Sequence, residues 1–419
     1  MSWSYSLALN WGDYIMEDII VQKYGGSSLE TIDKIKNVAK RIVKTKLSGN
    51  SLIVVVSAMG KTTDNLISMA GEICTEPAPR EMDMLLSTGE QMSMSLLAIA
   101  IQCMGYNAIS LTGSQCGILV YSDYSNARIG NIDTKRLKGE LSKDNIVIVA
   151  GFQGENSDGD IVTLGRGGSD TTAVALAAAV NAKKCEIYTD VDGIYTTDPR
   201  IVHRAKLLKD ISYDEMLELA KLGAKVLHPR AVEIARNFNV PLVVRSSLNN
   251  SEGTKVRETV SMEKAIVRGI TLDKDIAKIS ILEVPDRPGI AYNIFSKICE
   301  ANIGIDMIIQ NVHRNAVNDI SFSVKSQDLN KALKITKDIC KEINAKEVVS
   351  DNTVVKLSIV GTGIMGDPSV ITLFFETLYN LGINLEMIST SEIKISCIIN
   401  DYKAEEAVNE LHSKFKLDE

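Results

Sequence analysis

An alternation of strand-like and helix-like segments between Ile19 and Ser247 is the feature that most constrains the fold. Some segments, such as Leu52–Val56, are apolar at every position, which is typical of strands buried on both faces of a parallel sheet. The sequence therefore predicts an α/β domain with a largely parallel central sheet sandwiched by helices. The expected strands are Ile19–Lys23, Leu52–Ser57, Ile109–Thr112, Ile146–Gly151, Cys185–Thr189 and Pro241–Arg245, and the expected helices are Glu30–Lys46, Glu90–Met104, Thr172–Asn181, Tyr213–Leu222 and Pro229–Phe238.

The C-terminal part of the chain contains an internal repeat. Lys-Ile-Ser-Ile at Lys278 recurs as Lys-Leu-Ser-Ile at Lys356, and Asp-Met-Ile at Asp306 recurs as Glu-Met-Ile at Glu386, each about 80 residues later. The first copy has the pattern β-α-β-β-α-β, so we expect two ferredoxin-like α+β units.

The second copy has no obvious sixth strand, and the strand-like segment Ala265–Ile270 has no partner of its own. We expect this segment to complete the second unit, which would make the first unit an insertion. The expected boundaries are residues 16–247 for the α/β domain, 248–264 for a linker, 276–350 for the first unit, and 265–275 plus 351–419 for the second unit.

Composition narrows the class of protein. A chain of 419 residues is long enough for more than one domain. Its net charge of −7 argues against a role on nucleic acid or on a membrane surface. The seven cysteines are scattered without a Cys-x-x-Cys pair, as expected of reduced thiols in a cytoplasmic protein. The first 15 residues lack Lys and Arg, which argues against a secretory signal, and Met16 is a second candidate start.

The segment from Thr163 to Arg200 predicts a site for anionic small molecules. A glycine loop, Thr-Leu-Gly-Arg-Gly-Gly-Ser-Asp, opens a helix, and Ser169–Thr172 are good N-cap residues. Free N–H groups at a helix start attract anions, and Arg166 can clamp a carboxylate with two hydrogen bonds. Polar residues then follow the strand Cys185–Thr189, at the end where open α/β sheets bind ligands.

Several other residues have two interpretations. Lys23 ends an apolar strand directly before Gly25 and Gly26, so it is a candidate phosphate ligand. Ser87-Thr-Gly-Glu90 fits a capping box at the start of a helix. Asp170 could be a helix cap, and Lys225 a solvated charge at a helix end.

Seven motifs, taken together and in order, resemble the aspartokinase family, which has the amino-acid kinase fold followed by ACT domains. They are Lys-Tyr-Gly-Gly-Ser-Ser at Lys23, Val-Ser-Ala-Met-Gly at Val56, Ser-Thr-Gly-Glu at Ser87, Gly-Phe-Gln-Gly at Gly151, the glycine loop at Thr163, Thr-Asp-Val-Asp-Gly-Ile-Tyr-Thr-Thr-Asp-Pro-Arg at Thr189 and Gly-Ala-Lys-Val-Leu-His-Pro at Gly223. The resemblance extends from Met16 to the C-terminus.

The resemblance implies that ATP phosphorylates the β-carboxylate of L-aspartate, the first step towards lysine, threonine and methionine. This carboxylate is already ionised at neutral pH, so the reaction needs alignment and charge neutralisation rather than a general base. We expect Mg²⁺ to accompany ATP, held mostly by phosphates and water, with no protein metal site. The implied catalytic residues are Lys23, Asp170 and Lys225; the aspartate-binding residues are Ser57, Glu90, Arg166 and Ser169; the ATP-binding residues are Lys23, Gly25, Gly26, Thr189, Asp190, Tyr195, Arg200, Lys225 and Val226.

The ACT pair implies feedback inhibition by lysine, threonine or both. The family pattern often has Thr where Ile371 stands, which leaves the effector's identity open. The resemblance also implies a homo-oligomer, and Met262 could start a separately translated C-terminal subunit. The implied effector-binding residues are Asp286, Ala291, Gly304, Ile305, Asp306, Gln310, Val370, Ile371, Asn384, Leu385, Ser391 and Glu392.

Three other functions stay open from the sequence. A kinase for another acidic amino acid fits the same motifs, because none of them encodes substrate length. A non-catalytic amino-acid sensor would keep the fold, although the intact Lys23 and Arg166 argue against it. The third is a dinucleotide-dependent oxidoreductase. Gly361, Gly363 and Gly366, followed by Glu386, match a dinucleotide-binding fingerprint, but the remaining chain is too short for such a domain.

Overall fold

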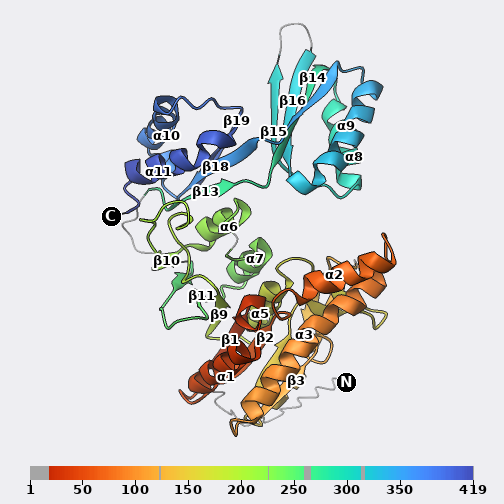
Figure 1. Ribbon diagram of the computed structural model, residues 1–419, viewed down its shortest axis with the longest axis vertical. Helices are drawn as coiled ribbons and strands as arrows, with labels where there is room; N and C mark the ends of the chain where they lie inside the picture. Colours follow the sequence, from red (N-terminus) through yellow and green to blue (C-terminus); the bar gives the residue numbers. More distant parts are fainter. Residues whose placement is uncertain (1–17, 122–123, 225, 259–265, 313–316, 419) are drawn as a thin grey trace, which may run out of the picture. The chain divides into compact units, whose positions relative to one another are not determined.

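The computed structural model describes residues 18–121, 124–224, 226–258, 266–312 and 317–418. Its contacts divide the chain into two compact units (Figure 1). The first unit is Met1–Asp192 with Arg230–Arg257, and the second is Gly193–Pro229 with Glu258–Glu419. The expected boundary near residue 247 therefore differs from the contact boundary, because residues 193–229 pack with the C-terminal part.

A largely parallel sheet forms the centre of the first unit. The order of its strands within this unit is β12-β11-β9-β1-β2-β6-β3, and β12 alone among them is antiparallel to its neighbour β11. All six residues of β2 are buried, as its apolar sequence predicts. The strands are β1 Ile19–Tyr24, β2 Ser51–Val56, β3 Ala108–Leu111, β6 Ile146–Ala150, β9 Lys184–Thr189, β11 Leu242–Ser246 and β12 Thr254–Val256.

Helices cover both faces of this sheet. Ile20 and Tyr24 of β1 pack in one apolar cluster with α1 (Ile32–Lys46) and α3 (Pro79–Gln102). The alternate residue Lys23 instead meets α5 (Gly168–Ala179). Since side chains alternate across a strand, α5 lies on the face opposite α1 and α3. Further elements are α2 Thr62–Ile73, α4 Lys135–Leu141, α7 Pro229–Asn237 and a small sheet of β4 Ile118–Tyr121, β5 Arg128–Ile132, β7 Gln153–Glu155 and β8 Ile161–Thr163.

Three expectations about this unit were wrong. Ser87 and Glu90 form no capping box, because α3 begins at Pro79 and both residues lie in its interior. Ser169–Thr172 are not N-cap residues, because α5 begins at Gly168 and its N-cap is Gly167. The stretch 248–264 is not only a linker, because β12 lies within it and pairs with β11.

The second unit contains two four-stranded antiparallel sheets, one for each copy of the repeat. In the first copy the order is β15-β16-β14-β17, with α8 (Ile290–Glu300) and α9 (Leu329–Glu342) packed against one face (Figure 1). Its strands are β14 Ala277–Pro285, β15 Ile305–Val312, β16 Val317–Val324 and β17 Glu347–Asp351.

The second copy has the order β13-β18-β20-β19 and carries α10 (Pro368–Asn380) and α11 (Ala404–Lys414). Its fourth strand comes from before the first copy, since Gly269 and Ile270 of β13 pair with Val360 and Ile359 of β18. This is the pairing that an inserted first copy requires; Ala265 itself lies outside the described residues. The strands are β13 Gly269–Asp273, β18 Val354–Val360, β19 Met387–Ser391 and β20 Lys394–Asn400.

Lysine–carboxylate pairs join the two copies reciprocally. Lys278 of the first copy pairs with Glu386 of the second at 2.9 Å, and Lys356 of the second pairs with Asp306 of the first. Met307 and Met387, which follow the two acidic residues, lie in one apolar cluster between the sheets. The repeated motifs therefore meet each other across a pseudo-symmetric seam.

Residues 193–229 belong to the second unit through many contacts. The Thr196 hydroxyl is 2.9 Å from Nε2 of His412 in α11, and the Thr196 carbonyl accepts a hydrogen bond from the N–H of Ile270. Val202 packs in the apolar core of the second copy. This segment carries β10 (Asp210–Ile211) and α6 (Tyr213–Lys221), whose N-cap Ser212 forms a complete capping box with Glu215.

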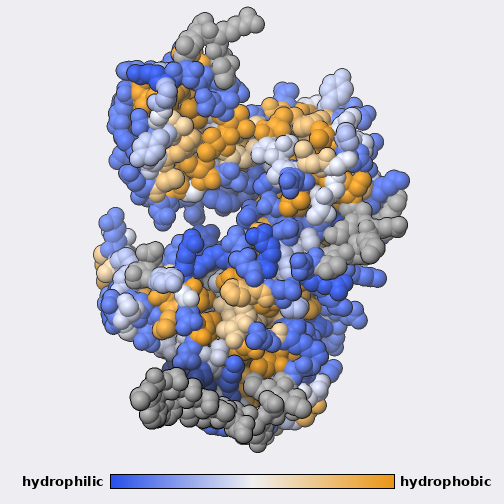
Figure 2. All heavy atoms as spheres, turned by 180° about the vertical axis from the view of Figure 1, so that it is seen from behind, coloured by the Kyte–Doolittle hydropathy of each residue, from blue (hydrophilic) through white to orange (hydrophobic). Residues whose placement is uncertain are grey.

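Packing accounts for two other sequence signals. A Cβ on Gly361, the first glycine of the dinucleotide-like motif, would lie 2.0 Å from the Ile266 carbonyl oxygen, so that glycine is required by a close chain approach. Helix α3 is long and apolar enough to cross a membrane, but half of its most apolar window is buried inside the protein. Hydrophilic residues cover much of the face shown in Figure 2.

Candidate functional site

An ion pair joins the end of β1 to the start of α5. The Nζ atom of Lys23 lies 2.6 Å from Oδ1 of Asp170, and each side chain is 12% exposed. Lys23 is the fifth residue of β1, and Asp170 lies in the first turn of α5. Two residues far apart in sequence therefore form one partly buried charged group that still reaches solvent.

The glycine turn after β1 lies against the end of β2. A Cβ on Gly26 would approach the Ala58 carbonyl oxygen to 2.6 Å, so only glycine fits there. The Ser57 N–H donates to the Tyr24 carbonyl at 3.1 Å, which holds Ser57 beside the turn. The structure thus brings together Ser57, Gly25, Gly26 and Lys23, as expected.

Glu90 of α3 points towards the same loop. One carboxylate oxygen accepts a hydrogen bond from the Ala58 N–H at 3.0 Å, and the other is buried without a hydrogen-bond partner among the described residues. Burial raises the pKa of Glu90 to about 7, although the Ala58 hydrogen bond and the charge of Lys23 oppose the shift. When ionised, this carboxylate lacks a full set of hydrogen bonds, so a cation bound next to it would stabilise the charged form.

The loop between β8 and α5 has the conformation that its glycines permit. Gly165 and Gly167 have φ values of 73° and 68°, in the left-handed region that disfavours other residues. Ser169 is buried against Gly151, where a Cβ would lie 2.8 Å from that of Ser169. Arg166 lies on the exposed part of the loop.

Two residues that the sequence did not single out hold this loop in place. Asp83 of α3 is fully buried and accepts hydrogen bonds from the N–H and hydroxyl of Thr163, at 3.0 and 2.7 Å. Arg230 of α7 donates to the Leu164 and Ala127 carbonyls at 2.6 and 2.8 Å. Asp83 gave no distinctive sequence signal, because other charged residues, Arg80 and Glu81, lie just before it.

The expected nucleotide-binding residues occur in both units. In the first unit, the Thr189 hydroxyl donates to Oδ1 of Asp190 at 3.0 Å. In the second, Arg200 forms a two-pronged ion pair with Asp198, and Tyr195 makes a backbone bridge with Leu207. Val226 is half-buried, and Lys225 lies outside the described residues.

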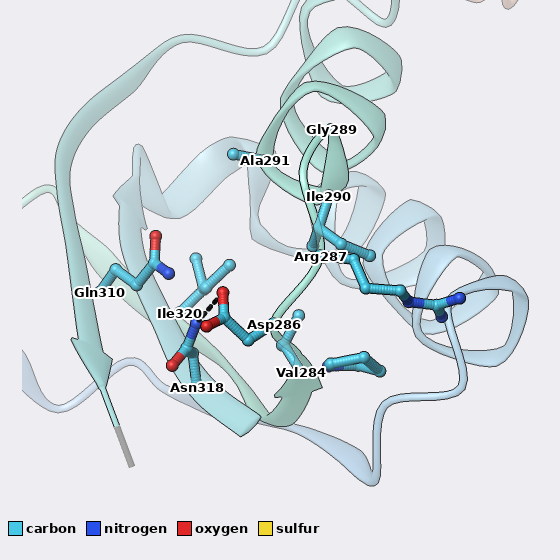
Figure 3. A pocket seen from close by; sticks show the side chains of 10 residues that line it. Val284, Asp286, Arg287, Gly289, Ile290, Ala291, Gln310, Asn318 and Ile320 are labelled. Carbon is cyan, nitrogen blue, oxygen red and sulfur yellow. Dashed lines mark hydrogen bonds between the residues drawn. The ribbon is translucent and has the colours of Figure 1, made fainter. Parts of the chain in front are cut away.

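A small cavity of about 100 Å³ opens in the first copy of the repeat, between the end of β14, the start of α8 and the edge of the sheet (Figure 3). The Nδ2 atom of Asn318 donates to Oδ1 of Asp286 at 3.2 Å, and Gln310 comes from the neighbouring strand. The Oδ1 atom of Asn318 is buried without a hydrogen-bond partner among the described residues. Arg287 points away from this group in Figure 3.

This cavity contains three of the expected effector-binding residues, Asp286, Ala291 and Gln310. It does not contain the others. Asp306 pairs with Lys356 at the seam, as described above. Sequence reasoning missed Asn318, which lacks a distinctive motif. The remaining expected residues are spread over several elements: Gly304 precedes β15 and Ile305 begins it, Val370 and Ile371 lie in α10, Asn384 and Leu385 precede β19, Ser391 ends β19 and Glu392 follows it.

The comparisons with known proteins match nearly all of the chain to one family. The sequence pattern of the amino acid kinase family matches residues 18–246, and that of the ACT domain matches residues 282–338 and 357–415. An aspartokinase of Geobacillus stearothermophilus is 50% identical over 402 residues, covering 96% of this chain and 98% of that protein. Aspartokinase 2 of Bacillus subtilis is 48% identical over 400 residues, covering 95% and 98%.

Solved structures of aspartokinases also resemble this chain. The aspartate kinase of Synechocystis is 47% identical, with a TM-score of 0.54, and the match covers 95% of this chain and 69% of that one. Aspartokinase III of Escherichia coli, solved with aspartate and ADP, matches with a TM-score of 0.80 over 95% of this chain and 99% of that one. Its identity is 24%, so this second match shows the fold alone.

Proposed function

The chain belongs to the amino acid kinase family as an aspartokinase, and on that premise we propose which of its residues perform the reaction. ATP transfers its γ-phosphoryl group to the β-carboxylate of L-aspartate, giving ADP and 4-phospho-L-aspartate. The observation that supports this assignment best is the Lys23–Asp170 ion pair, a cation held at the end of β1 beside a glycine turn.

Lys23 would stabilise the negative charge on the transferring phosphoryl oxygens. The nucleophilic carboxylate is already ionised, so the site must bring two anions together rather than remove a proton. Asp170 would keep the ammonium group of Lys23 in position through the 2.6 Å ion pair. Gly25 and Gly26 would let the phosphates approach the backbone, and Lys225 would supply a second cation.

Glu90 would bind the α-ammonium group of aspartate. Its second oxygen is buried without a hydrogen-bond partner among the described residues, and a substrate ammonium would fill this vacancy. Arg166 and Ser169, from the loop beside Asp170, would hold a substrate carboxylate, and Ser57 would line the same site. Thr189, Asp190, Tyr195, Arg200 and Val226 would contact the nucleotide.

Mg²⁺ would enter with ATP. Within the described part of the chain, no cluster of three His, Cys, Asp or Glu residues could hold a metal ion. We expect phosphate oxygens and water to supply most of the ligands of the ion, because Mg²⁺ prefers to retain water ligands. When bound, it would neutralise phosphate charge alongside Lys23.

The cavity of the first ACT copy would bind an amino-acid effector, lysine or threonine. Asp286 supplies a negative charge, and Asn318 supplies an acceptor without a hydrogen-bond partner in the described part of the chain, which suits an ammonium group. Gly289, with φ of 91°, is the N-cap of α8, so the exposed N–H groups of the first turn suit a carboxylate. The two copies, residues 276–350 and 265–275 plus 351–419, would form the regulatory part of a cytoplasmic homo-oligomer, with a separate C-terminal subunit as a further form.

The test is ADP release by the full chain with L-aspartate, ATP and Mg²⁺, with and without L-lysine and L-threonine. We expect aspartate-dependent turnover that one or both amino acids suppress. Turnover with L-glutamate but not L-aspartate would refute the substrate assignment. Turnover that neither amino acid changes would refute the effector assignment while leaving the kinase in place.

A further inference from the structure

A second charged cleft lies in the first unit, away from the proposed catalytic residues. Its volume is about 470 Å³, and four cationic side chains, Arg41, Lys44, Lys184 and Arg245, line it together with one carboxylate, Glu186. Such an excess of positive charge contrasts with the net charge of −7 for the whole chain.

The strand register separates this cleft from the Lys23–Asp170 pair. Gln22 pairs with Glu186 and Tyr24 with Tyr188, whereas Lys23 pairs with Ile187. Neighbouring residues of a strand point to opposite faces, so Glu186 and Tyr188 share the α1 face and Lys23 faces α5. Lys184 is the first residue of β9, whereas Thr189 and Asp190, which are expected to bind nucleotide, lie at the opposite end of this strand and directly after it.

Glu186 cannot neutralise the cleft. It is 3% exposed, and its two oxygens already accept hydrogen bonds from Gln22, Tyr188, Lys184 and Arg245 at 2.8, 3.1, 2.7 and 3.3 Å. One carboxylate balances one of four cations, so three positive charges remain for another partner.

Two of the cations are held rigidly. The guanidinium groups of Arg41 and Arg245 lie 5.2 and 5.7 Å from the centre of the Tyr188 ring. Arg41 also donates to the Asn249 carbonyl at 2.7 Å, and Arg245 to the Ser251 carbonyl at 2.8 Å. Because these side chains are already ordered, binding an anion would cost little additional conformational entropy.

We propose that this cleft binds a phosphate-bearing small anion with two or more negative charges. A phosphate group carries about −1.5 to −2 charges at neutral pH, which suits the three uncompensated cations. Phosphate oxygens can accept hydrogen bonds both from the planar guanidinium groups of arginine and from the compact ammonium groups of lysine. The volume exceeds that of one phosphate group, so a diphosphate or a phosphate ester fits better than inorganic phosphate alone.

The test is calorimetric titration of pyrophosphate into the full chain carrying Lys23→Ala, which weakens phosphate binding at the proposed catalytic site. We expect saturable binding that Lys44→Gln and Lys184→Gln each weaken about tenfold, the effect of one charge-assisted contact. Lys40→Gln, on an exposed position of α1 outside the cleft, should leave the affinity unchanged. Glu186→Gln should tighten binding, because it removes the only carboxylate that lines the cleft among the described residues.

Other outcomes would overturn the proposal. Binding that ignores Lys44 and Lys184, or no saturable binding, would mean that the cations serve only to hold the loop at Asn249–Ser251. Equal affinity for citrate at matched ionic strength would refute the phosphate class. Circular dichroism and melting curves of each variant, taken beside the titrations, separate lost binding from lost folding, and Glu186→Gln remains informative because the proposal requires a gain.

Discussion

The proposed catalytic site and the seam between the ACT copies both contain lysine–carboxylate pairs, but the carboxylates are paired to different extents in the two places. At the seam, Lys278 and Lys356 each meet one carboxylate of the other copy, and each repeated motif is used twice. At the proposed site, Lys23 and Asp170 pair beside Glu90, one oxygen of which is buried without a hydrogen-bond partner among the residues that the structure describes. The pairs of the seam therefore join the two copies, whereas we expect a ligand to bind where the Glu90 acceptor lies beside the Lys23–Asp170 pair.

The two ACT copies also share structural contacts but differ in residues near the cavity. Their central strands share a serine pair, Ser280–Ser321 at 2.7 Å and Ser358–Ser396 at 2.8 Å. Strand register matches Gln310 of the first copy with Thr390 of the second, since each faces the equivalent isoleucine of the next strand. The fold is therefore duplicated while the polar lining of the cavity is not.

The largest expected effect is on kcat and distinguishes Lys23 of the proposed site from Lys278 of the seam. Lys23→Met should lower kcat by about a hundredfold to a thousandfold, because it removes a cation that stabilises the transition state. Lys278→Met, which removes a lysine of the seam, should leave kcat nearly unchanged. Steady-state kinetics of both variants measure this, and near-normal turnover in Lys23→Met would exclude Lys23 from the mechanism.

The second largest expected effect is on inhibition through the cavity of the first ACT copy. Asp286→Ala should raise the inhibitor concentration needed for half inhibition by about tenfold or more, since it removes a charged partner of the effector ammonium. Glu283→Ala serves as the control, because Glu283 pairs with Lys346 and does not line the cavity. Unchanged inhibition in Asp286→Ala would place the effector site elsewhere.

A pH effect sharpens the contrast at Glu90. Its pKa of about 7 means that the carboxylate becomes protonated as the pH falls through 7, and only the ionised form attracts an ammonium group. The kcat/KM for aspartate should therefore decrease by about tenfold per pH unit below 7 and level off above it. Glu90→Gln should have a low kcat/KM that varies little between pH 6 and 8; a profile identical to that of the unmodified chain would remove Glu90 from binding.

The smallest effect concerns stability at the seam. Asp306→Asn should lower the free energy of unfolding by about 1–2 kcal/mol, because it leaves the Lys356 ammonium, on a side chain 2% exposed, without its charged partner. Glu386→Gln should cost less than about 1 kcal/mol, because Lys278 and Glu386 are both partly exposed. Urea denaturation of both variants measures these free energies. Equal decreases would mean that burial of the lysine does not make one pair more stabilising than the other.

Strong periodic signals predicted much of the architecture. The strands of the parallel sheet were predicted within one or two residues, because their apolar runs are long and buried. The repeat was visible because Lys278 and Asp306 have counterparts in the second copy. The glycine turn at Gly25 and the loop at Gly165 pointed to the site because a backbone requirement selects the residue type directly.

Short-range patterns failed where distant contacts decide the structure. Ser87 and Glu90 have the spacing of a capping box, but the same spacing occurs inside a helix. The Glu90 carboxylate instead accepts a hydrogen bond from the Ala58 N–H. The three residues of β12 are too few for a periodic signal. Membership of residues 193–229 in the second unit rests on contacts such as Thr196 with His412, which no local pattern records.

The reciprocal seam has a consequence for the origin of the chain. One copy of the repeat carries both the lysine and the acidic residue, so two identical copies could form both pairs about a two-fold axis. The two copies therefore contact each other within one polypeptide as the subunits of a symmetric homodimer would. After such a fusion the two halves become free to diverge in their ligand chemistry, provided that each keeps its half of both ion pairs.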